Sequence, residues 1–314
     1  MYASGPPHAV APLAAVAPLG SVAPLGIQRV SRRAFDRPAE LAGDPVHAGR
    51  LDVYLTDLLR PYGLALEPGA LEAGRGQSYG EMASAVMDEA VPPDADVDLV
   101  VLAYAVPDIT PGRATAAYLS HLCPGNRLAF AVCDQGVAAA FTALRLIREY
   151  ARTGGCRRGL LVVVEQADLP YPVPDPAALP VAHQAVAVLC GEPVGGPDQP
   201  PWTAALAEVR QHAGVVPDGI RARLATDLVP LCAGRTEVTL IAGGHLAADA
   251  IGAAGVDRVR IAPAGQPHTG VWWELAGELS EAKLEEGGQR RIVLADYDAD
   301  LRYLCLTAID VRHG

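Results

Sequence analysis

Three features that define other classes of protein are missing from this chain of 314 residues. No apolar run reaches 18 residues, so no membrane-spanning helix is predicted. The six cysteines are scattered, without a Cys-x-x-Cys pair or a histidine at ligand spacing, which argues against a structural zinc site or a disulfide framework. The formal net charge is −11 and no basic stripe is present, so nucleic-acid binding is not expected.

The composition that remains is that of a folded globular protein. Half of the residues are hydrophobic and 19% are charged, and the length allows a large core. Residues 1–26 form an Ala/Pro-rich stretch of low complexity, in which Val-Ala-Pro-Leu begins at Val10, Val16 and Val22. Proline at this spacing prevents a helix, and no charged segment marks a signal peptide. We expect a tail of undefined role, free thiols and a cytoplasmic location.

The central stretch of the sequence predicts a strand, a sharp turn and a long helix. Leu128–Val132 is a buried strand, Cys133–Gly136 is the turn, and the helix covers 137–152 before Thr153-Gly-Gly ends it. The turn therefore lies at a helix N-terminus, where free N–H groups and the helix dipole favour anionic chemistry. A cysteine there is expected to have a lowered pKa and to be a good nucleophile.

The two halves of the chain repeat one order of elements, with negligible sequence identity between them. Continuously apolar strands indicate a layered α/β fold in which both sheet faces are covered. The repeated order is a strand, a helix, a strand, a turn, a helix and a strand: 97–105 to 159–164 in the first half and 237–242 to 291–296 in the second. Further helices are expected at 45–61, 79–90, 202–212 and 218–232, and further strands at 27–35, 181–190 and 303–311. We expect halves at 27–190 and 202–314, joined by a linker at 191–201.

Several short segments resemble the thiolase superfamily, and more closely its ketosynthase III-like (β-ketoacyl-ACP synthase III) branch. They are Tyr79-Gly-Glu-Met-Ala, Asp98-Leu-Val-Val-Leu-Ala, Ala129-Phe-Ala-Val, Phe141-Thr-Ala-Leu, Thr153-Gly-Gly, Leu160-Leu-Val-Val-Val-Glu165, Gly244-His-Leu-Ala-Ala and His268-Thr-Gly. The resemblance covers about residues 27–314. It implies a thiolase-like α/β fold of five layers, αβαβα, with two pseudo-repeated halves. It also implies a homodimer in which the Ala-Phe-Ala-Val strand pairs across the two-fold axis.

The resemblance implies a nucleophilic cysteine at the helix start, but this sequence departs from that pattern. Alignment on the strand puts the nucleophile at Gly136, and alignment on the helix end puts it at Val137. Cys133 lies three or four residues too early, and either a rearranged turn brings it into the pocket or it is a buried apolar thiol. Gln135 is one residue out of register with the glutamine that replaces the cysteine in some relatives. With Gly136, it is a candidate for substrate binding.

The family also uses a histidine at a strand end and an asparagine before a helix, which stabilise the enolate and the oxyanion. His245 corresponds to the histidine, unless it only caps a helix. Gln266 or His268 corresponds to the asparagine, unless each is an ordinary turn residue. Trp272 is either a core residue or a wall of the acyl pocket.

The resemblance implies an acyltransferase or condensing enzyme of specialised, polyketide-type metabolism. It would take an acyl group from CoA or a phosphopantetheinyl acyl carrier protein, with Cys133 as the nucleophile or by direct transfer with His245 as the base. No cofactor and no metal is expected. The alternative is a catalytically silent thiolase-fold subunit that forms a heterodimer with an active ketosynthase. A general Rossmann-type binding protein is a third reading.

Overall fold

The computed structural model describes residues 25–111, 114–122, 128–173, 179–192, 202–235, 237–280 and 288–313. Most of the expected tail and of the expected linker therefore lies outside the described residues. The strands are β1 (Gly26–Phe35), β2 (Leu99–Ala103), β3 (Leu128–Val132), β4 (Arg158–Glu165), β5 (His183–Gly191), β6 (Trp202–His212), β7 (Val238–Ala242), β8 (Arg258–Ile261), β9 (Gln289–Asp298) and β10 (Tyr303–His313). The helices are α1 (Pro45–Leu59), α2 (Tyr79–Ala90), α3 (Thr115–Leu122), α4 (Ala138–Arg152), α5 (Ile220–Cys232), α6 (Ala247–Ala250) and α7 (Gly270–Ser280).

The strand order is that of an internal duplication. The strands follow one another as β3-β2-β4-β5-β1-β6-β10-β9-β7-β8, so the order in the first half is mirrored in the second. In the first half β2, β3 and β4 are parallel, and β5 is antiparallel to β4. In the second half β7, β8 and β9 are parallel, and β10 is antiparallel to β9. The halves join through two residue pairs of β1 and β6, Gly26 with Ala205 and Ile27 with Ala204.

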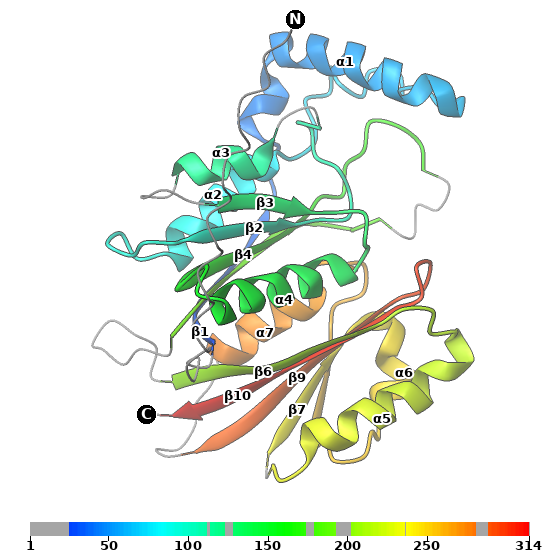
Figure 1. The fold of residues 1–314 in the computed structure, drawn as a ribbon. Helices are drawn as coiled ribbons and strands as arrows, with labels where there is room; N and C mark the ends of the chain where they lie inside the picture. Colours follow the sequence, from blue (N-terminus) through cyan, green and yellow to red (C-terminus); the bar gives the residue numbers. More distant parts are fainter. Residues whose placement is uncertain are drawn as a thin grey trace, which may run out of the picture.

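The elements form five layers, as the resemblance implied. Helices α4 and α7 lie between the two halves of the sheet, α2 and α3 cover one outer face, and α5 and α6 cover the other (Figure 1). The central layer holds the largest core cluster, in which Phe141 and Leu144 of α4 pack with Leu275 of α7. Burial of each such side chain contributes about 1.5–3 kcal/mol, which fixes the two central helices against each other.

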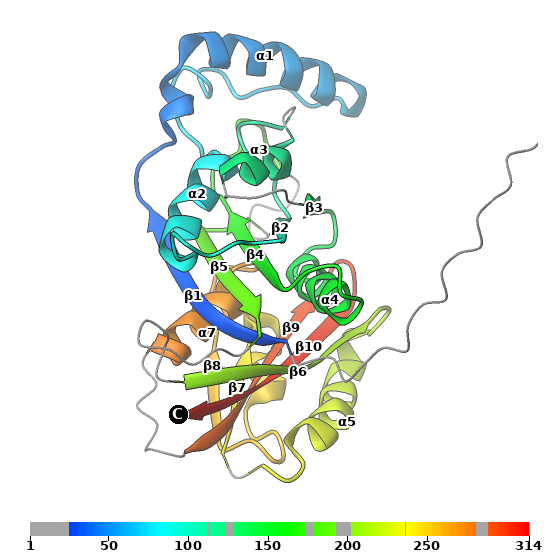
Figure 2. The ribbon, with the colours of Figure 1, turned by 60° about the vertical axis from the view of Figure 1, so that its left-hand side comes forward.

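The prediction of a helix at Trp202–His212 was wrong, because this segment is strand β6. Its alanine, leucine, glutamate and arginine residues favour helix locally. In the structure, however, Ala204 and Leu206 are buried at alternate positions, and β6 pairs with β10 over most of its length. Figure 2 shows β6 beside β10 at the junction of the halves. Tertiary pairing overrides the local preference.

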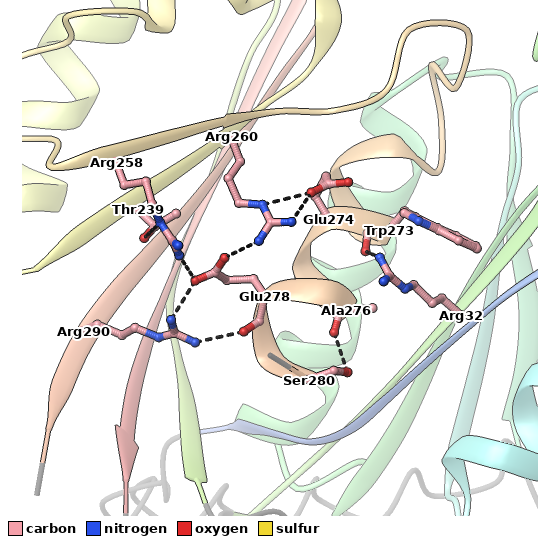
Figure 3. Close-up of polar contacts among 10 residues, drawn as sticks. All are labelled: Arg32, Thr239, Arg258, Arg260, Trp273, Glu274, Ala276, Glu278, Ser280 and Arg290. Atoms are coloured by element: carbon pink, nitrogen blue, oxygen red, sulfur yellow. Dashed lines mark hydrogen bonds and ion pairs between the residues drawn. The ribbon is translucent and has the colours of Figure 1, made fainter. Parts of the chain in front are cut away.

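Helix α7 is held to the second half of the sheet by buried ion pairs (Figure 3). The carboxylate of Glu278, which is 2% exposed, pairs with Arg258, Arg260 and Arg290. Arg260 also pairs with Glu274 one turn earlier on α7, at 2.8 Å. These contacts fix the helix whose N-terminus faces the candidate site. None of the described helices has the length and apolar character needed to cross a bilayer.

Candidate active site

The N-termini of the two central helices, α4 and α7, meet at one small cavity. The turn 133–136 leads from β3 into α4, and the segment 262–269 leads from β8 into α7. These two connections correspond in the duplicated order, and they approach each other where the strands end. The cavity between them has a volume of about 90 Å³. Its walls are Ala105, Val106, Gly136, Val137, Glu165, Pro180, Pro267, His268 and Asp298.

Gly136, the first candidate position for the nucleophile, has no room for a side chain. Its φ is +48°, a backbone conformation that favours glycine. A Cβ atom at this position would overlap Oδ2 of Asp298, which comes from the end of β9. A carboxylate of this chain thus fills the volume that a cysteine side chain needs.

Asp298 also caps α4. Its Oδ2 accepts a hydrogen bond from the backbone N–H of Val137 at 3.2 Å, and its Oδ1 accepts one from Leu301 N–H at 2.8 Å. A carboxylate at a helix N-terminus is stabilised by the helix dipole. Asp134, the acidic residue of the turn itself, is exposed and bonds the thiol of Cys133 instead. The anion-binding end of α4 is therefore occupied by Asp298.

A second glycine, Gly243 at the end of β7, faces a second aspartate in the same way. A Cβ atom on Gly243 would overlap Oδ1 of Asp296. Asp296 is 5% exposed, and its Oδ1 accepts a hydrogen bond from Tyr297 N–H at 2.9 Å. Burial raises the pKa of Asp296 to about 8, and the negative charges of Asp298 and Glu165 add to this effect. The carboxyl group is therefore largely protonated at neutral pH.

Glu165, at the end of β4, orders the segment that carries His268. Its Oε2 accepts a hydrogen bond from His268 N–H at 3.0 Å, and its Oε1 accepts one from the hydroxyl of Thr269. The hydrogen-bond network orients the amide of Gln266 so that its nitrogen donates to Glu165 and its oxygen accepts from Ala182 N–H at 3.0 Å. Burial raises the pKa of Glu165 to about 7, against the lowering effect of these donors.

His268 is the one histidine that lines the cavity. It is 2% exposed, and neither ring nitrogen has a hydrogen-bond partner of normal geometry. Burial lowers its pKa to about 4, although the backbone of Ala103 and Gly136 and the charge of Asp298 act in the opposite direction. The ring is therefore neutral at physiological pH, and its two nitrogens are buried within the cavity wall.

The expectation of a lowered pKa at Cys133 was wrong. Burial, followed by the hydrogen bond to the carboxylate of Asp134 at 3.2 Å, raises the pKa of this thiol. Cys133 lies at the end of β3, before the positive-φ residue Asp134, and it is not part of the cavity wall. A protonated thiol outside the cavity is a poor nucleophile for chemistry within it.

The other predicted site residues lie apart from the cavity or act within the fold. His245 is exposed on a 3-10 turn, Gly244–Leu246, that follows β7. The side chain of Gln135 accepts a hydrogen bond from the Thr142 hydroxyl of α4 at 2.7 Å. Trp272 is 1% exposed and packs on Phe141 in the central core, with ring centroids 5.2 Å apart. Of the predicted residues, the cavity wall includes Gly136, Val137 and His268.

The cavity brings together two carboxyl groups and one neutral histidine. This arrangement accepts protons and hydrogen bonds, and buried groups with perturbed pKa values mark functional sites. It supplies no thiolate. Among the described residues, no group of three or more His, Cys, Asp and Glu side chains is placed to hold a metal ion.

Sequence reasoning missed the three carboxylates, although a signal for them is present. Each follows an apolar strand: Glu165 ends Leu160–Val164, and Asp296 and Asp298 follow Ile292–Ala295. Strand ends at the carboxyl edge of a parallel sheet are where α/β folds place their ligand sites. An acidic residue at such an end was therefore a candidate for the site.

Several solved structures have the same fold as this chain. AbyA1, a tetronic acid condensing enzyme, is 17% identical over 91% of this chain and 99% of that chain, with a TM-score of 0.56. A variant of OleA from Xanthomonas campestris is 14% identical over 92% and 98% of the chains, with a TM-score of 0.61. Another OleA variant, with bound lauric acid and lauroyl-CoA, is 14% identical over 93% and 99% of the chains, with a TM-score of 0.57.

No family model and no curated protein matches the sequence. The likeness to the solved structures extends over more than nine-tenths of this chain and nearly all of theirs. It agrees with the duplicated strand order and with the five layers. The chain therefore has the thiolase-like fold that the resemblance in its sequence implied.

Proposed function

We propose that this chain is a ketosynthase III-like acyltransferase that passes an acyl group directly from a thioester to an acceptor. The donor is a CoA or carrier-protein thioester, and His268 is the base. The observation that carries the proposal is the filled nucleophile position: Asp298 occupies the volume beside Gly136. A covalent acyl-enzyme there would require the side chain of Asp298 to move, whereas the neutral ring of His268 lies in the cavity wall beside this position.

In this reaction the acceptor binds with its X–H group toward His268. The acceptor atom forms a bond to the thioester carbonyl carbon, and the ring nitrogen takes the proton. The C–S bond then breaks, and His268 returns the proton to the leaving sulfur. Binding both reactants next to the base makes the transfer effectively intramolecular, so that no acyl-enzyme has to form and break down.

The size of the cavity favours a short acyl group. At about 90 Å³ it is far smaller than the roughly 300–1,000 Å³ pockets that enclose drug-sized ligands. It has room for the reacting groups alone. We therefore expect acetyl-CoA to be a better donor than lauroyl-CoA.

The test is acceptor-dependent release of CoA from acetyl-CoA, measured with a thiol reagent. His268→Ala should reduce kcat/KM by about 10²–10⁴-fold, the usual contribution of a general base. His245→Ala should have little effect, because His245 is exposed and outside the cavity wall. If His245→Ala abolishes turnover and His268→Ala does not, the assignment of the base is wrong.

A second candidate is the silent partner subunit of an active ketosynthase. Edge strand β3 favours it, because Leu128 is 47% exposed and Ala131 is also exposed. An apolar sheet edge of this kind is available for pairing with another chain. Co-expression with a ketosynthase tests this candidate. Stable co-purification, together with no CoA release by this chain alone with any acceptor, would support it.

A further inference from the structure

We infer that a second pocket, separate from the catalytic cavity, binds a small organic ammonium ion. The pocket lies where the first turns of three helices meet: Asp44 is the N-cap of α1, Ser78 is the N-cap of α2, and Thr115 begins α3. Its volume is about 390 Å³, which falls within the roughly 300–1,000 Å³ range of small-molecule sites. The inference is independent of the proposed acyl transfer.

Three carboxyl groups set the charge of this pocket. Glu40, Asp44 and Glu81 line it, and no lysine, arginine or histidine is among its lining residues. The carboxylate of Glu81 is fixed, because it accepts hydrogen bonds from the backbone N–H groups of Glu40 at 2.9 Å and Leu41 at 3.3 Å. Oδ1 of Asp44 accepts one from Val46 N–H at 2.9 Å. Since a carboxylate has about four acceptor positions, all three groups can still accept hydrogen bonds from a ligand.

The hydroxyl group of Ser78 is the second feature that points to a ligand. Ser78 is 6% exposed, and its side chain forms no capping bond to α2 and no other hydrogen bond among the described residues. Unlike the ring nitrogens of His268, its Oγ is open to the pocket. A Cβ atom on Gly80 would lie 3.5 Å from this oxygen and 3.1 Å from Cε1 of Tyr118, so the hydroxyl and the aromatic ring face the same space. A ligand there supplies the hydrogen bond that the buried hydroxyl lacks.

Tyr118 of α3 supplies an aromatic wall. The residue is 52% exposed, and its ring lies against the backbone of Gly80. A cation beside the face of a tyrosine ring is attracted by the quadrupole of the ring. The N–H groups of an ammonium ion also donate to carboxylates and to a hydroxyl oxygen. An anion would meet three negative charges, and a neutral ligand would leave them without a counter-charge. The combination therefore favours an organic cation.

The experiment titrates the full chain with putrescine, 1,4-butanediol and succinate at low ionic strength, using isothermal titration calorimetry. The three probes share a four-carbon chain and carry a double positive charge, no charge and a double negative charge at neutral pH. We expect putrescine to bind with a stoichiometry of one per chain and with an affinity that falls as salt is added. The other two probes should not bind.

Two substitutions locate the bound probe. Ser78→Ala and Glu40→Gln should each weaken putrescine binding by at least about fivefold, because each removes one acceptor. Both variants should fold normally, since neither side chain forms a hydrogen bond or ion pair among the described residues. Glu72→Gln is the matched control, because Glu72 is exposed and does not line the pocket. Thermal unfolding of each variant confirms that it is folded.

Each contrary outcome overturns the inference. Equal binding of 1,4-butanediol would show that the pocket does not select a charge. Putrescine that binds Ser78→Ala and Glu40→Gln as tightly as the wild-type chain would lie elsewhere on this acidic protein. Absence of putrescine binding would remove the site altogether. None of these results bears on acyl transfer, because the pocket and the catalytic cavity share no lining residue.

Discussion

At the scale of single residues, the site is defined by two glycines that face two aspartates. Gly136 and Gly243 leave space at the ends of β3 and β7, and Asp298 and Asp296 of β9 fill it. The carboxylate of Asp298 is fixed at the N-terminus of α4 by the backbone N–H of Val137. His268 is the histidine of the cavity wall.

A thiol at position 136 should be tolerated only when Asp298 is removed. Gly136→Cys alone places Cβ on Asp298 and adds a side chain at φ +48°, so we expect a loss of stability of about 2 kcal/mol or more. Gly136→Cys with Asp298→Gly should recover part of this loss. Urea unfolding of both single variants and the double variant gives the coupling energy. Simple additivity would contradict the overlap.

Asp296 should make the protein less stable as the pH rises. Its folded pKa of about 8 lies above the ordinary value of 3.8, so the fold favours the protonated form. The stability from this group is complete below about pH 4 and is lost as the pH rises to about 8. Asp296→Asn should therefore stabilise the protein by about 2–4 kcal/mol at pH 8 and by much less at pH 4. Urea unfolding at both pH values measures this, and an equal effect at each would contradict it.

The fall in activity at acid pH should occur at a much lower pH than it would with an ordinary histidine as the base. The pKa of His268 is lowered from 6.5 to about 4, mainly by burial. Asp298, Glu165 and the backbone of Ala103 and Gly136 are the polar groups that face the ring or its segment. The base form should persist to about pH 5, so kcat/KM should not fall near pH 6.5. A profile with an apparent pKa near 6.5 would contradict the assignment of the base to His268.

The position of the turn along the chain could be predicted from the sequence, whereas the side chain that packs against it could not. The strand and helix patterns place the turn Cys133–Gly136 just before the helix, which begins at Ala138 in the structure, because hydrophobic periodicity is a local property. The filling of that position depends on Asp298, which is 162 residues away in the chain. The lowered pKa expected for Cys133 was wrong, because burial and the contact with Asp134 raise the pKa of this thiol.

At the scale of elements, α7 depends on the buried carboxylate of Glu278. This group pairs with three arginines, of which Arg290 is 7% exposed (Figure 3). Glu278→Gln would leave the buried Arg290 without a counter-charge, while Arg260 keeps its pair with Glu274, and we expect a loss of about 3–5 kcal/mol of stability. Glu274→Gln is the control, because among the described residues Glu274 forms an ion pair only with Arg260 and is 15% exposed. Equal losses in urea unfolding would show that the burial of Glu278 is unimportant.

Element type was predictable where burial and composition agree. Helix α2 matches its prediction at Tyr79–Ala90, and the bounds of β3 match at Leu128–Val132. The expected burial of β3 was wrong, because Leu128 and Ala131 are exposed on this edge strand and only Val132 is buried. The sequence of β6 favours helix, and its pairing with β10 is a contact that no local pattern reports. The helix expected directly after the strand at 237–242 is a single turn in the structure, where α6 covers Ala247–Ala250.

At the scale of the whole molecule, the unpaired edge of β3 is the feature that predicts assembly. Its exposed apolar residues fit the dimer that the resemblance implies, with two copies paired along this strand. We expect Ala131→Lys to convert a dimer into a monomer in analytical ultracentrifugation. Val229→Lys, at a 64% exposed position on α5, is the control. A wild-type chain that is monomeric at every concentration would contradict this.

The most direct test of the central claim is the intact mass of the chain after incubation with acetyl-CoA. The filled position at Gly136 and the raised pKa of Cys133 leave no competent nucleophile at the site. We therefore predict an unchanged mass during turnover, with free CoA appearing only when an acceptor is present. An acetyl adduct that disappears in Cys133→Ala would contradict the account and restore covalent catalysis by that cysteine.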